Sequence, residues 1–348
     1  MDEFFAIIAE SFQSFGILPA EVCEDRSISD NNIETNPESC QKGSPTTLRQ
    51  GKPGNLGDPE PSLTLFYELL VHPVSDLLDE PEIIIVPDRS LYRVPFPALL
   101  NERGKYLSEN FRIRVVPSLS TLKLIQDSPA DFHSQTDAVV VGDPDVGRKV
   151  IYRGSEKRDF YPLPGARKEA QMIARRLGVQ PLLGQDATKP AVLERMKSAS
   201  LIHIAAHGNA ERGEIALAPP ASTTGIPQED DYLLKMSDIA KVQVRAKLVV
   251  LSCCHSGRGQ IRAEGVVGIA RAFLGSGARS VLVALWALDD NATKKLMSRF
   301  YEHLVRGEST SVSLLAATKW MRDHGFTKVP SWAPFMLIGD DVTFAFEK

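Results

Sequence analysis

Short runs of apolar, β-branched residues alternate with amphipathic helical segments along most of this chain, and that alternation constrains the fold most. The runs DAVVVGDP, LIHIAAHG, KLVVLSCC and SVLVALW are apolar almost without a break, as expected of strands buried on both faces. Such strands separated by helices predict a mostly parallel sheet covered on both sides, an α/β fold. The expected strands are 82–88, 111–118, 137–144, 201–208, 214–219, 247–254, 280–286 and 333–339, and the expected helices are 63–78, 167–178, 264–277, 290–305 and 310–324.

The amino-terminal part of the chain has a different character. Apolar residues recur at helical spacing over residues 4–15, which predicts a short amphipathic helix within residues 1–22 that packs on this protein or on an upstream domain. Residues 23–62 hold few aliphatic residues and no aromatic one. Because so little apolar surface cannot offset the entropy of ordering, we expect a disordered linker there. The folded body is expected to start at Leu63.

Composition excludes several classes of protein. Of the 348 residues, 43% are hydrophobic and 24% are charged, and the net charge of −4 lacks the basic excess of a nucleic-acid-binding protein. Four cysteines in a chain of this length do not form a disulfide framework. Asp2 and Glu3 stand where a secretory signal needs positive charge, and no apolar run is long enough to cross a membrane. We therefore expect a cytoplasmic protein with no membrane partner and no nucleic-acid partner.

Two of the expected strands end in residues that can carry chemistry. One run ends in His207-Gly208-Asn209, and another ends in Cys253-Cys254. Catalytic groups of parallel sheets gather beyond the carboxyl ends of the strands, so His207 and Cys254 can converge at one edge. A thiol beside an imidazole is the minimum equipment for covalent acyl transfer. The spacing of 47 residues from His207 to Cys254 agrees with the interval of roughly 50 residues in caspase-like peptidases. Taken singly, either residue is more commonly part of a buried core.

Three other kinds of site find no support. His203 and His207 lie on an extended strand, where about 13 Å separates them, too far to share a metal ion. The segment GDPDVGRK lacks the lysine and hydroxyl residue of a phosphate-binding P-loop. The glycines after Glu264 do not form a dinucleotide-binding fingerprint. We expect no metal and no cofactor.

The motifs together resemble a known family. HIAAHGN, VVLSCCHSGRG, EGVVGIARAFLGSGARSVLVALWALDD and WAPFMLIGDD are similar to the CHAT domain, a caspase- and separase-like cysteine peptidase domain usually found behind tetratricopeptide repeats. FYELLVHPVSDLL, IIIVPDRSLYRVPFPALL and RVVPSLSTL resemble its amino-terminal half. The resemblance covers about residues 63–348. It implies a caspase-like three-layer α/β/α sandwich, divided into a structural half (63–155) and a catalytic half (156–348).

The resemblance also implies roles for single residues. His207 matches the catalytic histidine and Cys254 the nucleophile, while Cys253 is a neighbour of the site. The backbone N–H groups of Gly208 and Cys254 are expected to hold the oxyanion. No residue that would orient His207 is evident in the sequence. His255 departs from the family pattern, and it either affects the thiol or, as we expect, faces solvent.

Substrate recognition is expected at the next strand end. In separase-like relatives an acidic residue four places after a tryptophan lies in the pocket for the residue before the cut, and Asp290 matches that position after Trp286. Together with Asp289 and Asn209, it is a candidate substrate-binding residue, and its carboxylate would favour Arg or Lys in the substrate. Asp289 and Asp290 also fit the first turn of the helix that follows.

The sequence thus predicts a cysteine endopeptidase that acts through a Cys–His dyad on protein substrates and is regulated by a partner or an upstream repeat domain. The alternative is a pseudo-peptidase that acts as a protein-interaction module. The loops 219–231 and 255–265 are polar and contain glycine or proline. We expect the first to be an exposed excursion and the second a gating loop after the nucleophile.

Overall fold

The structure is a computed structural model that describes residues 61–129, 131–209, 213–257, 260–262 and 265–346. The predicted helix within 1–22 and nearly all of the predicted linker 23–62 lie outside the described residues. The described chain starts at Pro61, which is also the first residue of a helix.

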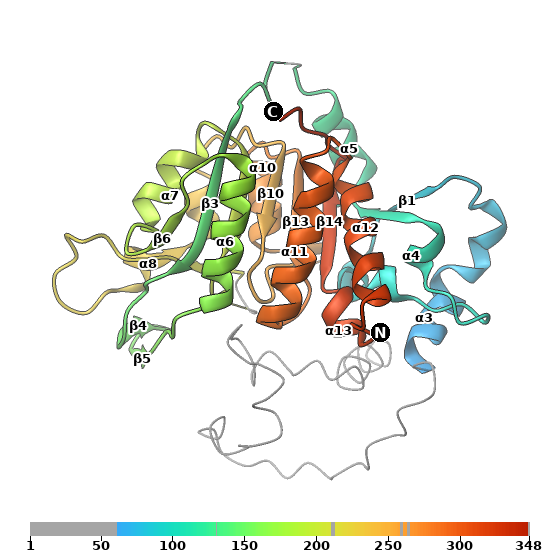
Figure 1. Ribbon diagram of the computed structural model, residues 1–348, viewed down its shortest axis with the longest axis horizontal. Helices are drawn as coiled ribbons and strands as arrows, with labels where there is room; N and C mark the ends of the chain where they lie inside the picture. Colours follow the sequence, from blue (N-terminus) through green and yellow to red (C-terminus); the bar gives the residue numbers. More distant parts are fainter. Residues whose placement is uncertain (1–60, 130, 210–212, 258–259, 263–264, 347–348) are drawn as a thin grey trace, which may run out of the picture.

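An eight-stranded sheet forms the centre of the molecule (Figure 1). Every neighbouring pair runs parallel except β13–β14. The predicted α/β class with a mostly parallel sheet is therefore confirmed. In spatial order the strands are β1 (Glu82–Ile85), β2 (Arg112–Val115), β14 (Phe335–Gly339), β13 (Ser280–Ala284), β10 (Leu248–Leu251), β7 (Ala199–Ala205), β3 (Asp137–Pro144) and β6 (Leu182–Gly184).

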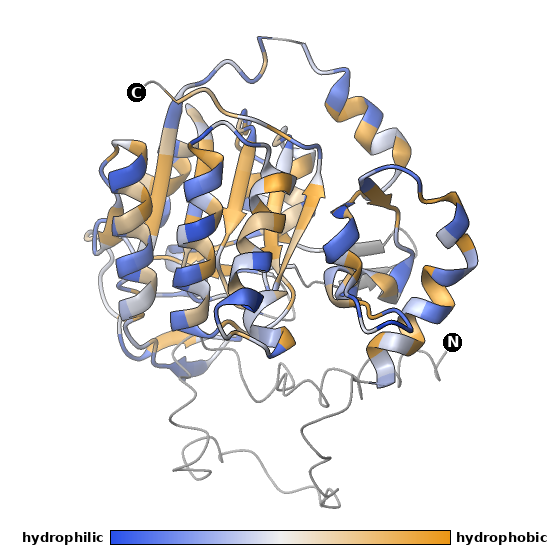
Figure 2. Ribbon diagram, turned by 45° about the vertical axis from the view of Figure 1, so that its right-hand side comes forward, coloured by the Kyte–Doolittle hydropathy of each residue, from blue (hydrophilic) through white to orange (hydrophobic). Residues whose placement is uncertain are grey.

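Helices cover both faces of this sheet. In Figure 1 the helices α6 (Pro164–Leu177), α11 (Asp290–Leu304) and α12 (Thr310–Asp323) lie in front of the strands, and α10 (Ile269–Gly275) lies behind them. Figure 2 shows that the central strands are strongly hydrophobic and that the helices carry their polar residues on the outside. Every residue of β7 is buried, so this strand is covered from both sides. Because strands this apolar are stable only when both faces of the sheet are covered, helices pack on each side and the molecule has three layers.

Local sequence signals fix the ends of the main helices. Pro164 opens α6 at a position whose N–H has no intrahelical partner, and Gly178 ends it with a left-handed backbone (φ 70°) that suits glycine. The carboxylate of Asp289 caps α11 by accepting the N–H of Ala292 at 2.6 Å. The hydroxyl of Ser309 caps α12 in the same way. Each cap contributes on the order of 1 kcal/mol.

Shorter elements surround the sheet. Three two-stranded ribbons are formed by β4 (Val150–Tyr152) with β5 (Glu156–Arg158), β8 (Ile215–Ala216) with β9 (Leu233–Leu234), and β11 (Gln260–Arg262) with β12 (Gly265–Val267). The remaining helices of the described residues are α3 (Pro61–Leu70), α4 (Leu107–Asn110), α5 (Leu119–Gln126), α7 (Lys189–Met196), α8 (Glu229–Tyr232), α9 (Met236–Ile239) and α13 (Val329–Trp332). Short 3-10 turns are η1 (His72–Leu77), η2 (Arg89–Arg93) and η3 (Phe96–Ala98).

The prediction of one helix over 264–277 is wrong in its first part. Residues 265–267 form strand β12, and only Ile269–Gly275 is helical. The β-branched pair Val266-Val267 favours a strand, and Gly268 takes an extended backbone (φ −152°) before α10 begins. The expected strand over 214–219 is also shorter than predicted, and it belongs to a ribbon outside the central sheet.

The amino-terminal part of the described chain contributes strands to both sides of the sheet. β1 and β2 form one edge, whereas β3 lies between β7 and β6. The predicted division into a structural half before residue 155 and a catalytic half after it stays a prediction, because strands from both parts are mixed in one sheet.

Candidate active site

Strands β7 and β10 bring the two sequence-predicted catalytic residues to one edge of the sheet. The strands are parallel neighbours, with Leu251 paired with Ile204. The N–H of Ser252 donates to the carbonyl oxygen of Ile204 at 2.8 Å, which extends the pairing beyond the assigned strand. Both chains therefore leave the sheet at the same point, one toward His207 and the other toward Cys254.

Gly208 lies directly against the backbone of Cys254. A Cβ atom at position 208 would collide with the carbonyl oxygen of Cys254 and would lie 3.3 Å from the Cβ of Cys253. The chain that follows His207 can approach the nucleophile candidate this closely because it has glycine there. This contact is the strongest sign that the two strand ends form a single site.

The imidazole of His207 is held by a backbone carbonyl. Its Nε2 lies 2.8 Å from the carbonyl oxygen of Tyr161, and the ring of Phe160 meets it edge-on at 5.2 Å between centroids. Because a carbonyl only accepts hydrogen bonds, Nε2 carries the proton, and in the neutral ring Nδ1 carries the lone pair. Nδ1 is therefore the nitrogen that can act as a base.

Sequence reasoning missed Tyr161, and the reason is general. The group that orients His207 belongs to the main chain, so no side-chain type marks its position. The one available signal is Pro162, which disfavours helical backbone at the residue before it and so delays the start of α6.

The environments of the two neighbouring thiols differ. Cys254 is fully buried, and its Sγ accepts the N–H of Leu288 at 3.4 Å. Cys253 is also fully buried, but its Sγ donates to the carbonyl oxygen of Ile204 at 3.3 Å. An N–H directed at sulfur stabilises negative charge on it, whereas donation to a carbonyl requires the protonated thiol. The two sulfurs thus differ in the hydrogen bond described for each, since Cys254 accepts one and Cys253 donates one.

The backbone after Cys254 reverses at once. His255 has a left-handed conformation (φ 57°), and its N–H donates to the carbonyl oxygen of Trp286 at 3.2 Å. The hydroxyl of Ser256 donates to Leu251 and accepts the N–H of Ala284, both at 2.8 Å. These hydrogen bonds hold the turn that follows β10 against the end of β13.

The expectation that His255 faces solvent is wrong. Its side chain is completely buried. Nothing in the sequence singles out Ser256. Its hydroxyl links the ends of β10 and β13 and so helps to position Cys254, two residues earlier.

The candidate oxyanion donor Gly208 sits in a short antiparallel bridge with Ile215. The bridge is closed by the N–H of Ala216, which donates to His207, and by the N–H of Asn209, which donates to Glu214, both at 2.9 Å. Neither bond uses the N–H of Gly208.

The three candidate substrate-binding residues lie in different surroundings. Asp289 caps α11, as described above. The carboxylate of Asp290 packs on Gly165 in the first turn of α6, where a Cβ atom would collide with it. The side-chain amide of Asn209 donates to the hydroxyl of Tyr152 on β4. Asp290 is half-buried and lies two residues after Leu288, whose N–H donates to the Sγ of Cys254.

A second histidine lies deeper on the same strand. The Nε2 of His203 is 3.1 Å from Oε1 of Glu169, and its Nδ1 is 3.1 Å from the hydroxyl of Tyr301. All three residues are fully buried between β7, α6 and α11. His203 thus takes part in the packing beneath the site rather than in a shared ion site with His207.

The one cluster of possible metal ligands among the described residues, Glu68, His72 and Glu102, lies elsewhere and is largely exposed.

Comparison with known proteins places this arrangement in a family. The family model of the CHAT domain matches residues 60–340, which is most of the chain. The chain belongs to the CHAT domain family. It is 31% identical over 330 residues to human tetratricopeptide repeat protein 28 and 32% identical to the mouse protein, in each case over 81% of this chain. The alignment spans only 13% of the length of these relatives.

Solved structures show the same fold. The CHAT domain described here superposes on budding-yeast separase, solved as a separase–securin complex, with a TM-score of 0.50 and 16% identity over 75% of this chain and 15% of that chain. At this identity the likeness concerns the fold alone.

Among the described residues of this CHAT domain, no helix combines the length and the hydropathy needed to cross a membrane.

Proposed function

We propose that this CHAT domain is a cysteine endopeptidase in which Cys254 attacks the substrate and His207 transfers protons. The observation that carries the proposal is the contact between Gly208 and the backbone of Cys254, which joins the two strand ends into one site. The bond from Tyr161 to Nε2 of His207 supports it, because it leaves Nδ1 as the basic nitrogen.

The proposed reaction follows from these positions. Nδ1 of His207 takes the proton of the Cys254 thiol, and the thiolate attacks the carbonyl carbon of the scissile peptide bond. The N–H groups of Gly208 and Cys254 hold the oxygen that becomes negatively charged, each contributing on the order of 3 kcal/mol. The imidazolium then protonates the departing amine, and water hydrolyses the thioester with His207 again as the base.

Asp290 is the proposed determinant of specificity. A half-buried carboxylate at the carboxyl edge of β13 would bind the guanidinium or ammonium group of the residue before the cut. Asp289 and Asn209 would shape this region, Asp289 by capping α11 and Asn209 by holding Tyr152.

We also propose a cytoplasmic location, where free thiols such as Cys253 and Cys254 stay reduced.

A second function is favoured by one specific observation. Cys254 is fully buried and His207 is 4% exposed, so a substrate reaches them only after the surrounding loops move. A pseudo-peptidase that serves as a protein-interaction module would keep this closed state permanently. A peptidase would open when a regulatory protein, such as a tetratricopeptide-repeat partner, binds.

Labelling by a covalent probe distinguishes the two functions. An acyloxymethyl ketone peptide with arginine in the first position should label wild type at Cys254, as read by mass spectrometry of the digested protein. Cys254→Ala and His207→Ala should abolish labelling, and Cys253→Ala is the matched control that should keep it. Asp290→Asn should reduce labelling by the arginine probe and not by a norleucine probe.

The opposite results have clear meanings. Labelling that survives in Cys254→Ala and disappears in Cys253→Ala would transfer the nucleophile to the neighbouring thiol. Absence of labelling in the full chain, with and without a tetratricopeptide-repeat array joined upstream, would favour the interaction module.

A further inference from the structure

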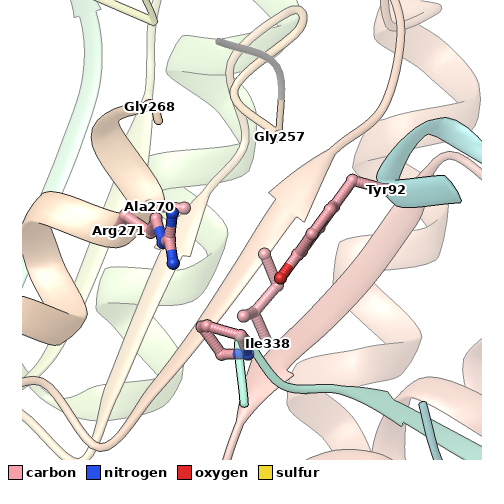
Figure 3. A pocket seen from close by; sticks show the side chains of 7 residues that line it. Tyr92, Gly257, Gly268, Ala270, Arg271 and Ile338 are labelled. Carbon is pink, nitrogen blue, oxygen red and sulfur yellow. The ribbon is translucent and has the colours of Figure 1, made fainter. Parts of the chain in front are cut away.

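A small pocket lies between η2 and α10, and neither His207 nor Cys254 lines it (Figure 3). The space inside it is about 20 Å³, and it opens to solvent. Figure 3 shows the hydroxyl of Tyr92 and the guanidinium of Arg271 facing the pocket from opposite sides, with Ile338 between them. The pocket is lined by Tyr92, Pro117, Gly257, Gly268, Ala270, Arg271 and Ile338.

The Tyr92 hydroxyl is buried without a hydrogen-bond partner among the described residues. The residue is 6% exposed, and its oxygen has no hydrogen-bond partner within the described part of the chain. Buried hydroxyl groups are nearly always paired, because leaving water without a replacement bond is unfavourable. A buried, unpaired hydroxyl directed into a pocket suggests that a ligand supplies the missing bond.

Arg271 supplies a positive charge on the other side. Its side chain is half-buried and makes no ion pair or hydrogen bond with any described residue. The carboxylate of Asp88 is 74% exposed and lies 3.8 Å from Arg89. The charges of Arg271 and Asp88 both act on Tyr92, in opposite directions.

We propose that this pocket binds a short carboxylate, held by the guanidinium of Arg271 and the hydroxyl of Tyr92. Arginine recognises carboxylates through paired, charge-assisted hydrogen bonds, and the phenol would donate to the same group. Pro117, Ala270 and Ile338 would receive the short apolar body of the ligand. Burial raises the pKa of Tyr92, so the phenol stays protonated and able to donate at neutral pH.

The pocket lies on the face of the sheet opposite to the helices α6 and α11. Leu282 pairs with Val250, which pairs with His203, so Leu282 shares the face of His203 and the next residue, Val283, points to the other face. Gly257 packs on Val283, since a Cβ there would lie 2.8 Å from its Cγ2. The proposed ligand site thus lies on the face of the sheet opposite to His203, and it does not depend on the peptidase proposal.

The test is a binding titration of the full chain at constant ionic strength. Acetate, propionate and butyrate are added, with the corresponding amides as neutral controls, while the Arg271 side-chain Nε–H and the Tyr92 ring are followed by NMR. We expect saturable binding of the acids in the millimolar range or tighter and none of the amides. A blocked glutamate, N-acetyl-Glu-amide, forms a second arm: binding tighter than that of butyrate would identify an acidic protein side chain as the source of the carboxylate, and weaker binding a free acid.

Two substitutions make the proposal falsifiable. Arg271→Gln should weaken binding about tenfold or more, and Tyr92→Phe should weaken it several-fold. Tyr92→Phe should at the same time leave the resistance to urea unchanged or increased, because it removes an unpaired buried hydroxyl. Arg195→Gln, at an exposed arginine of α7, is the matched control and should bind as wild type does. Equal binding of acids and amides, or unchanged binding in Arg271→Gln, would overturn the proposal.

Discussion

At the scale of single residues, the candidate site depends on how closely two backbones approach. Gly208 has no room for a side chain against Cys254, whereas Gly275 in α10 has no neighbouring atom within 4 Å of an added Cβ. We expect Gly208→Ala to push the two strand ends apart. It should cost about 1–3 kcal/mol of unfolding free energy and abolish labelling of Cys254.

The control for this prediction is Gly275→Ala. In a helix this change is neutral or stabilising by up to about 1 kcal/mol. Urea unfolding measures the stability of both variants, and the arginine probe measures the site. Wild-type stability and labelling in Gly208→Ala would show that the strand ends tolerate separation.

The two candidate catalytic residues could be singled out from the sequence because their side chains mark them. His207 and Cys254 each follow an apolar run, and that position alone predicts a common edge. Tyr161 could not be read in this way, since its carbonyl is present at every residue. The burial of His255 depends on a backbone reversal that the sequence does not reveal, because a left-handed conformation at a histidine has no reliable local signal.

At the scale of elements, a buried arginine joins strands that are distant in sequence. Arg114 on β2 forms two hydrogen bonds with the carboxylate of Glu82 on β1, at 2.9 and 2.8 Å, and a third with the carbonyl oxygen of Gly339 on β14, at 3.0 Å. Its side chain is 5% exposed. Burial by itself lowers the pKa of Arg114, but the hydrogen bond and charge of Glu82, together with the charges of Asp341 and Asp340, outweigh burial and raise it.

We expect Arg114→Met to lower the unfolding free energy by about 3–5 kcal/mol, since it removes the arginine that pairs with Glu82, while Asp340 keeps its pair with Arg279. Urea denaturation at neutral pH measures the loss. Arg306→Met is the matched control, because Arg306 is 58% exposed in its pair with Glu302 and should change stability by less than about 1 kcal/mol. Similar losses in the two variants would mean that the buried cluster adds nothing to the sheet edge.

Elements with one strong signal were predicted well, and those with mixed signals were not. The run at 137–144 matches β3, and Gly178 ends α6 as expected. The segment 264–277 mixes alanine, glycine and valine, so its apolar residues fit a helix as well as a strand. Pairing of β11 with β12 decides the outcome, and that pairing is a tertiary contact.

At the scale of the whole molecule, the class of fold was predictable but the order of strands was not. Alternating strands and helices imply a covered parallel sheet wherever each strand lies. The position of β3 between β7 and β6, and the antiparallel direction of β14, depend on which surfaces fit each other after the helices have packed. No local pattern in the sequence specifies these choices.

Three buried tyrosines in different parts of the molecule give the fold a common response to alkaline pH. Burial raises the pKa of Tyr92, Tyr232 and Tyr301, and the charge of Glu169 adds to this effect at Tyr301. Above pH 10, the ordinary pKa of tyrosine, the unfolded chain loses these protons while the folded protein keeps them. The folded state then binds more protons, so the unfolding free energy falls as pH rises, whereas these groups have no effect below about pH 9.

Each such tyrosine contributes a slope of up to about 1.4 kcal/mol per pH unit above pH 10. We expect Tyr301→Phe to make the fall less steep by about one such contribution, even though loss of the bond to His203 lowers its stability at neutral pH by about 1 kcal/mol. Tyr161→Phe, whose tyrosine is 55% exposed, should keep the wild-type slope. Urea unfolding between pH 8 and 11 measures all three proteins, and an unchanged slope in Tyr301→Phe would show that this phenol ionises inside the folded protein as readily as in water.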